Sequence, residues 1–468
     1  MRSIRHIAGL LALLCLAGVW TITRCQPTPT MKPASPPAPS SLSPVVPHDA
    51  NFSDLPAKPT LPQVQHDFDV FSWQSFVALN WPARANGSAD PGKVIGASGD
   101  NFTVWDGYRE AYTIFLANGA KPVPWGTSSP APAACQKTAP DVRKVLRMIQ
   151  KVSDQVLDAH GQPFGTGPLV DQQNGRYVRY EITVNRDSFD YIVNHTLYNK
   201  EGQKNFTKLV DFPSGVVPTP TPAGAKSAAS ATANAPVGAI VIKAAWKVMG
   251  PTDHPERFHT TRAIVYTPAS SDPPTKESCS VQTMGLVGLH IAHKTASSPQ
   301  WVWSTFEQVD NVQVPAGSGL QANFYRPNST YPVNQPPPRP WNPNVVLPIN
   351  KRSQVKRMIA IDAATQALNS QWQARLRAVN PKSVWQFYEL VSTQWPTQPK
   401  NSVTGPNATG NPAPQFLANT TLETYIQGKT PNVSSSCIGC HNNATTTNAK
   451  FSDFTYLLER AQSTQGGK

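Results

Sequence analysis

Five residues in this 468-residue chain have the types and spacing for defined chemistry: Cys437-Ile438-Gly439-Cys440-His441. Two thiols three positions apart, followed directly by a histidine, form the pattern by which a haem is attached: the thiols bond to the porphyrin and the histidine ligates its iron. A disulfide between the two cysteines or half of a zinc site is the alternative, but no second Cys/His cluster with zinc spacing lies nearby. The motif therefore predicts one covalent haem c, with its iron, at Cys437, Cys440 and His441.

A sixth iron ligand would have to come from upstream, because no residue after His441 is a methionine or a histidine. The best candidates are His290 and His293, in the apolar run Met284–His293. On a helix they would share one face and both could contact the haem, whereas on a strand they would face opposite ways and only one could. A histidine in such a run also commonly serves as a core residue. Weaker candidates are Met284, His66 and Met358, and an open or water-bound iron is a further alternative.

Hydrophobic patterning predicts the elements that must position these residues. Alternation of apolar and polar residues predicts strands at 176–184, 239–249, 261–267 and 301–307. Helical spacing predicts helices at 67–81, 141–157, 357–376, 383–395, 422–427 and 451–462. With 47 prolines, 28 glycines and only 15% charged residues, a helix bundle is not expected. The expected fold is α+β: a mainly antiparallel β body with flanking helices and a short C-terminal haem-attachment segment.

Composition divides the chain into four parts. Residues 1–25 combine Arg2 and Arg5 with an apolar stretch, which indicates an export signal, either cleaved or kept as a membrane anchor. Residues 26–62 are rich in Pro, Ser, Thr and Ala and predict a disordered tether. Residues 63–430 form the α+β body, with a low-complexity insertion at 216–236, and residues 431–468 hold the haem motif.

Charge and the remaining cysteines limit the partners and the compartment. The formal net charge is +13, which suits an acidic redox partner or an anionic surface, although it also serves solubility. An exported protein without a basic run is not expected to bind nucleic acid. Export places the protein in the periplasm or outside the cell, either free or anchored to a membrane through its N-terminus. There Cys135 and Cys279 either form a disulfide or remain two thiols.

Several segments together resemble a family of large, single-haem, exported bacterial proteins of the cytochrome c type. The segments are FSWQSFVALNWP, RYVRYEITVN, KAAWKVM, MGLVGLHIAHKT, WVWSTFEQVDN, SSSCIGCH and DFTYLLERA. The resemblance spans about Phe71 to Ala461 and implies haem binding at Cys437, Cys440 and His441. The chain differs from small cytochromes in lacking a downstream methionine, which argues against their His/Met coordination.

Electron transfer is the function that the sequence favours, with a haem that passes single electrons between partners. The alternative is a haem-dependent oxidoreductase, a peroxidase or an oxygenase, because the body is larger than a carrier needs. In that case His290 or His293 would act as a distal acid/base. A sensor or scaffold with a structural or gas-binding haem is the third class. Whether the protein is an enzyme is left open by these residues.

Overall fold

An antiparallel sheet forms the centre of the computed structural model, which describes residues 42–96, 102–138, 141–142, 144–148, 167–216, 236–271, 274–398, 412–428 and 435–464. These residues belong to a single unit, Pro39–Lys468. The expected signal at 1–25 and the first part of the expected tether lie outside the described residues, as does most of the low-complexity insertion.

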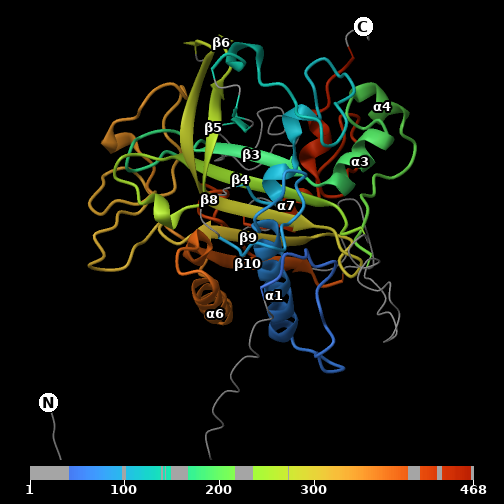
Figure 1. Ribbon diagram of the computed structural model, residues 1–468, viewed down its shortest axis with the longest axis horizontal. Helices are drawn as coiled ribbons and strands as arrows, with labels where there is room; N and C mark the ends of the chain where they lie inside the picture. The colour runs from blue at the N-terminus through green and yellow to red at the C-terminus, as the bar shows by residue number, and fades with distance from the viewer. Residues whose placement is uncertain are drawn as a thin grey trace, which may run out of the picture. The chain divides into compact units, whose positions relative to one another are not determined.

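The main sheet follows one path of neighbouring strands. Their order is β1 (Arg109–Glu110), β3 (Arg179–Val184), β4 (Ile240–Val248), β8 (Ser278–His293), β9 (Val302–Gln308), β10 (Tyr388–Pro396) and β11 (Pro412–Ala413). In Figure 1 the strands from β3 to β10 lie one below another in this order. The first half of β8 pairs with β5 (Thr260–Thr267), which pairs in parallel with β2 (Val145–Leu146). A separate hairpin joins β6 (Ser270–Ser271) to β7 (Pro274–Thr275).

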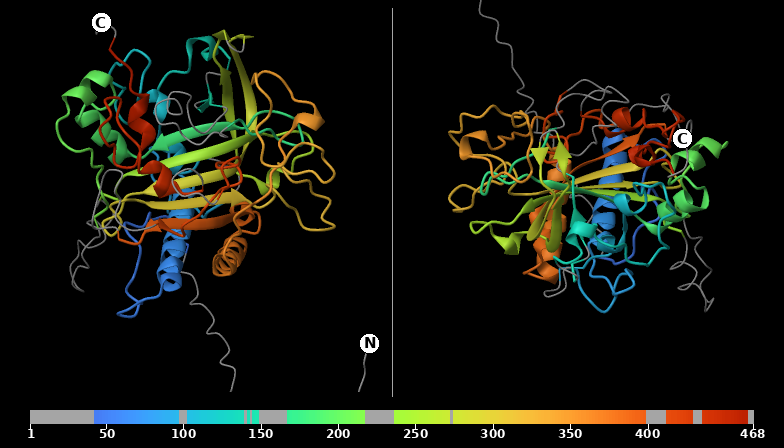
Figure 2. Two further views of the ribbon diagram at one scale, coloured as in Figure 1. Left: turned by 180° about the vertical axis from the view of Figure 1, so that it is seen from behind. Right: turned by 90° about the horizontal axis from the view of Figure 1, so that it is seen from above.

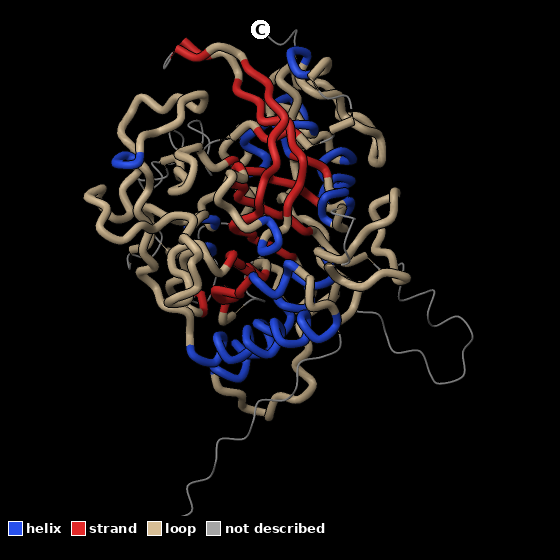
Figure 3. Tube along the Cα trace, turned by 60° about the vertical axis from the view of Figure 1, so that its left-hand side comes forward, coloured by secondary structure: helices blue, strands red, loops and turns tan. Residues whose placement is uncertain are grey.

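Helices lie outside the strands (Figure 3). They are α1 (Leu61–Leu79), α3 (Arg186–Asn194), α4 (Lys200–Asn205), α6 (Ala363–Val379) and α7 (Cys437–His441). Short 3₁₀ helices occupy Trp105–Gly107, Ala111–Thr113, Ala133–Cys135, Pro255–Arg257, Ile349–Lys351, Val384–Phe387 and Tyr456–Arg460. Helix α1 begins at a capping box formed by Thr60 and Gln63. Helix α6 begins where the Asp362 side chain accepts a hydrogen bond from the Ala364 amide, which satisfies one of the unpaired donors of its first turn.

The sheet buries both of its faces. On one face, α1 and α6 pack through aromatic residues: Trp73 stacks on Trp372, with ring centroids 5.7 Å apart, and Phe76 on Phe306, 4.3 Å apart. The other face is covered by the C-terminal residues, whose buried Leu458 belongs to the second large core cluster. Figure 2 shows this segment, in red, beside α3 and α4, in green. The Gln203 amide of α4 donates to the Leu458 carbonyl at 2.8 Å.

The predicted fold class is confirmed: the sheet dominates, is mainly antiparallel and has helices around it. The strands expected at 176–184, 239–249, 261–267 and 301–307 are present as β3, β4, β5 and β9. The helix expected at 67–81 is present as α1, which begins earlier, at Leu61, and ends at Leu79. The helix expected at 357–376 begins later, at Ala363.

Four predicted helices differ from the structure. Residues 383–395 form a 3₁₀ turn and strand β10, because pairing with β9 suits their aromatic and β-branched side chains. Residues 422–427 form turns, and 451–462 form only the 3₁₀ helix Tyr456–Arg460. In 141–157, the pair Val145–Leu146 is strand β2, and 149–157 lie outside the described residues.

Cys135 and Cys279 form a disulfide, with Cα atoms 5.5 Å apart and a sequence separation of 144. It ties the 3₁₀ helix Ala133–Cys135 to the first half of β8. This outcome is one of the two that the sequence allowed.

Replacing both cysteines by alanine should lower the free energy of unfolding by about 5 kcal/mol, because the long closed loop restricts the unfolded chain. Urea unfolding of the double variant C135A/C279A, compared with the wild type with and without reductant, measures the difference. Equal unfolding midpoints for the oxidised wild type and the variant would contradict a stabilising role.

Candidate haem-attachment site

The two thiols of the motif lie on the short helix α7. The Ser436 side chain accepts a hydrogen bond from the Gly439 amide at 3.1 Å and so caps the helix. Strand β10 anchors it from below, since the Gln394 side-chain oxygen accepts from the Ile438 amide at 2.8 Å. Cys437 and Cys440 are three positions apart on this helix, so they project from neighbouring points on one side. Both are half-buried, which leaves them partly accessible for chemistry.

The His441 ring is held in one tautomer. Its Nδ1 lies 2.8 Å from the Phe454 carbonyl oxygen. A carbonyl only accepts, so Nδ1 carries the proton and donates it, and the lone pair of the neutral ring is then on Nε2. Histidines that ligate metals are commonly oriented by this kind of hydrogen bond. The donor set and the tautomer therefore fit a haem, which Cys437 and Cys440 would attach and whose iron His441 Nε2 would ligate.

Two aromatic side chains flank the His441 ring. The Trp303 ring of β9 lies 4.5 Å from it, and the Tyr456 ring lies 5.2 Å from it, both as centroid distances. The Tyr456 hydroxyl also donates to the Cys440 carbonyl at 2.8 Å. Residues of the sheet and of the C-terminal segment thus fix the orientation of the histidine.

The sheet register separates the two upstream histidines. Ala292 of β8 pairs with Trp303 of β9, and His290 pairs with Thr305. His290 is therefore on the same face as Trp303. The two residues are diagonal neighbours, whose Cα atoms are typically roughly 7–8 Å apart in an antiparallel sheet. His293 is an odd number of positions away on the same strand, so it points to the opposite face.

His290 faces a carboxylate on its side of the sheet. Its Nε2 lies 3.2 Å from Glu423 Oε2, and both side chains are about nine-tenths buried. Glu423 belongs to the chain segment that covers this face, and its carboxylate also accepts from the Asn419 amide at 3.0 Å. A histidine next to a carboxylate can serve as a ligand or as an acid/base group.

His293 is a core residue on the face of α1. It is fully buried, stacks on Phe71 with centroids 5.4 Å apart, and its Nε2 lies 2.7 Å from the Val237 carbonyl oxygen. Burial lowers its pKa to about 4, because a charged ring would lose its hydration. His293, predicted as a metal ligand or distal acid/base, therefore lies on the face of the sheet opposite to Trp303 and His441.

The weaker candidates are also dispersed. Met284 is fully buried in the cluster that contains α1 and α6, and His66 is on α1. Met358 is 58% exposed. His290 is thus the one upstream candidate of the sequence analysis placed on the α7 face of β8.

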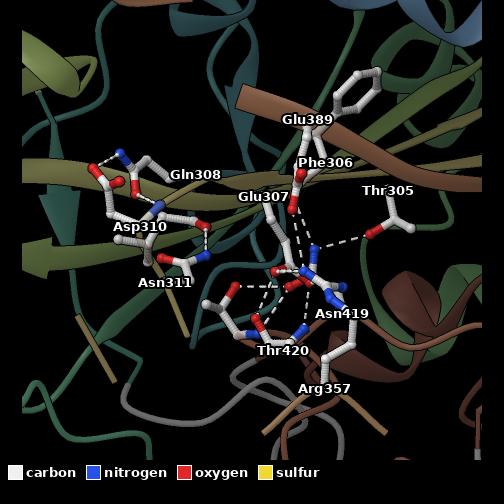
Figure 4. A network of polar contacts seen from close by, with 12 residues as sticks. Thr305, Phe306, Glu307, Gln308, Asp310, Asn311, Arg357, Glu389, Asn419 and Thr420 are labelled. Carbon is white, nitrogen blue, oxygen red and sulfur yellow. Dashed lines mark hydrogen bonds and ion pairs between the residues drawn. The ribbon is translucent and has the colours of Figure 1, made fainter. Parts of the chain in front are cut away.

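A buried polar network, not expected from the sequence, attaches the segment that contains Asn419, Thr420 and Glu423 to the sheet (Figure 4). Glu307 of β9 has no exposed surface, accepts from the Thr420 amide and hydroxyl, and pairs with Arg357 at 2.9 Å. Asn419 donates to the Thr305 hydroxyl at 2.9 Å. The available signal was a single charged residue, Glu307, in a strand that is otherwise uncharged, since a buried carboxylate needs partners. This network fixes the segment that carries Glu423.

Comparison with protein-family models, curated proteins and solved structures finds no match for this chain. Within the described ranges, no three or more His, Cys, Asp or Glu side chains gather as a metal site would require. In the same part of the chain, none of the helices has the length and apolar character to cross a membrane.

Acidification should destabilise the fold through His293. With a pKa of about 4 in the folded state and 6.5 when unfolded, the unfolded chain binds more protons between these values. The contribution of His293 to the free energy of unfolding is therefore complete above pH 6.5. It falls by on the order of 3 kcal/mol as the pH drops to 4. Urea unfolding of His293→Gln at pH 7 and pH 5 should show a smaller pH effect than the wild type.

The matched control is His254→Gln, because His254 is half-exposed and should leave the pH effect unchanged. An undiminished pH effect in the His293 variant would assign the acid sensitivity to other groups.

Proposed function

We propose that the protein is an exported c-type cytochrome that holds one covalent haem at Cys437, Cys440 and His441 and transfers electrons. The observation that carries the proposal is the hydrogen bond from His441 Nδ1 to the Phe454 carbonyl, which sets the tautomer of a histidine directly next to the two half-buried thiols of the motif. When bound, the haem supplies a single-electron redox centre. The protein side chains supply its attachment, the axial ligand and the orientation of that ligand.

A chain of aromatic rings supports electron transfer. The His441 ring contacts Trp303, whose ring centroid lies 6.4 Å from that of Trp301. The Trp301 centroid in turn lies 6.0 Å from that of Phe212. Phe212 in turn lies 4.7 Å from the half-buried Tyr191 on α3. Closely packed π systems are better electronic bridges than saturated side chains, so this row connects the proposed ligand to the α3 surface. An acidic redox partner would suit the net charge of +13.

Export is supported by two independent features. The N-terminal basic and apolar residues have the composition of an export signal. The Cys135–Cys279 disulfide suits an oxidising compartment such as the periplasm or the cell exterior. Attachment of the protein to a membrane through residues 1–25 remains part of the same proposal.

The second candidate function is a haem oxidoreductase, a peroxidase or an oxygenase, and the His290–Glu423 pair favours it. On the face shared with Trp303, His290 could move a proton at Nε2 with Glu423 as its partner. The same side chain could instead close the iron as a sixth ligand, which would leave electron transfer as the function. The two candidates therefore differ in whether the iron is open.

Optical spectra of the protein, matured in a host that attaches c-type haem, test the proposal. The wild type should carry covalent haem that resists acid–acetone extraction, and C437A/C440A should carry none. His441→Gly should retain covalent haem with altered bands that added imidazole restores. A wild type without covalent haem would overturn the proposal and leave Cys437 and Cys440 as a disulfide or metal pair.

His290→Gln, with His293→Gln as its matched control, separates the two candidate functions. If His290 ligates the iron, its variant should convert low-spin bands to high-spin bands and gain carbon monoxide binding, while the control stays unchanged. If the wild type is already high-spin and reacts with peroxide, the His290 variant should slow that reaction at least tenfold. Identical spectra and reactivity in both variants would exclude His290 from either role.

A further inference from the structure

The carbonyl that accepts the His441 hydrogen bond is in an unusual stretch of backbone. Asp453 and Phe454 both have positive φ, 52° and 61°. This left-handed region is uncommon and unfavourable for residues with a side chain. Two in succession persist only where the surroundings hold them. The contacts of Asp453 provide this hold.

Asp453 is fully buried and anchored on two sides. Its Oδ2 accepts from Lys294 Nζ at 2.6 Å and from the Phe212 amide at 2.8 Å. Lys294, which directly follows β8, is itself 1% exposed and also pairs with Asp211, whose side chain is 55% exposed. The Lys294 amide donates to the Ala239 carbonyl at 2.9 Å. The backbone of the sheet therefore fixes the cation, and the cation fixes the strained turn.

Electrostatics makes this pair expensive as a stabilising device. Burial raises the pKa of Asp453 to about 7, although Lys294 opposes that rise. Removing two charges from water costs several kcal/mol per ion, and an apolar pair of similar shape is often as stable. The pair gives something that an apolar contact would not: a directional link, over 159 residues of sequence, from the end of β8 to the residue before Phe454.

We propose that the Lys294–Asp453 ion pair positions the Phe454 carbonyl on His441 Nδ1 and thereby lowers the reduction potential of the haem. The inference rests on the proposed function. A short, well-aligned hydrogen bond to Nδ1 gives the ring more imidazolate character, and a more basic axial ligand favours ferric iron. Asp453 and Lys294 are thus positioning residues that act through Phe454 and His441, without contact to the iron.

The pair also unites two roles of strand β8. His290 lies within the strand on the α7 face, and Lys294 follows its last residue. A shift of β8 relative to the C-terminal segment would therefore alter the support of His441 and the position of His290 together.

Redox titration of the haem-loaded, full-length protein tests the inference, with Asp453→Asn as the variant. Asparagine keeps the shape but removes the charge that binds Lys294, so the reduction potential should rise. The ferric electron paramagnetic resonance signal should shift at the same time, because it reports the axial ligand. The matched control is Asp211→Asn, which removes the exposed carboxylate from the same lysine and leaves 453–454 untouched, so its potential should stay close to that of the wild type.

The outcomes separate this inference from the proposed function. A wild type without covalent haem would overturn the proposed function. Covalent haem in the wild type and in D453N, with equal potentials or with equal shifts in D453N and D211N, would overturn the positioning role alone. Should D453N not accumulate, Lys294→Met removes the other half of the pair and keeps the Phe212 hydrogen bond to Asp453. A reduction potential above that of the wild type in that variant supports the role, and an equal or lower one overturns it.

Discussion

The pairing of β8 with β4 and β9 is the constraint on which the candidate site depends. After a bulge at Val287 in this 16-residue strand, residues Gly288 to His293 pair in unbroken register with both β4 and β9, so their side chains alternate between the two faces. The alternation sends His290 to the face of α7 and His293 to the face of α1. The register with β9 places Trp303 beside His441 on the same side. A slip of β8 by one residue would exchange the faces of the two histidines.

Buried charges and amides help to determine how the C-terminal segment docks on this face. The Glu307 carboxylate accepts a hydrogen bond from Thr420 and pairs with Arg357. The Gln394 side chain accepts a hydrogen bond from the first turn of α7. Lys294 holds Asp453 in the same way. Such contacts are directional, and leaving one unpaired costs about 1–3 kcal/mol or more. They specify one arrangement of a segment that has little regular secondary structure of its own.

Some elements could be predicted because their local pattern and their tertiary role agree. The alternation in 176–184 and 239–249 and the aromatic helix at 67–81 are of this kind. Residues 383–395 are the opposite case. Their apolar positions fit a helix, yet they extend along β9 because that edge offers unpaired backbone groups. Tertiary contacts also limit 451–462 to one short 3₁₀ helix. The contacts of Asp453, Phe454 and Tyr456 with residues distant in sequence outweigh local helix formation.

The sequence by itself determined the chemistry that the site can offer: two thiols and a histidine at haem-attachment spacing, and two upstream histidines three residues apart. It also determined the alternating strands, since amphipathic periodicity is a local property of the chain. Only the tertiary structure decided which histidine shares a face with α7, that Cys135 pairs with Cys279, and that Phe454 accepts from His441. Those outcomes depend on the register of strands and on contacts between residues more than a hundred positions apart, or on a strained turn held by such contacts, and no local pattern records them.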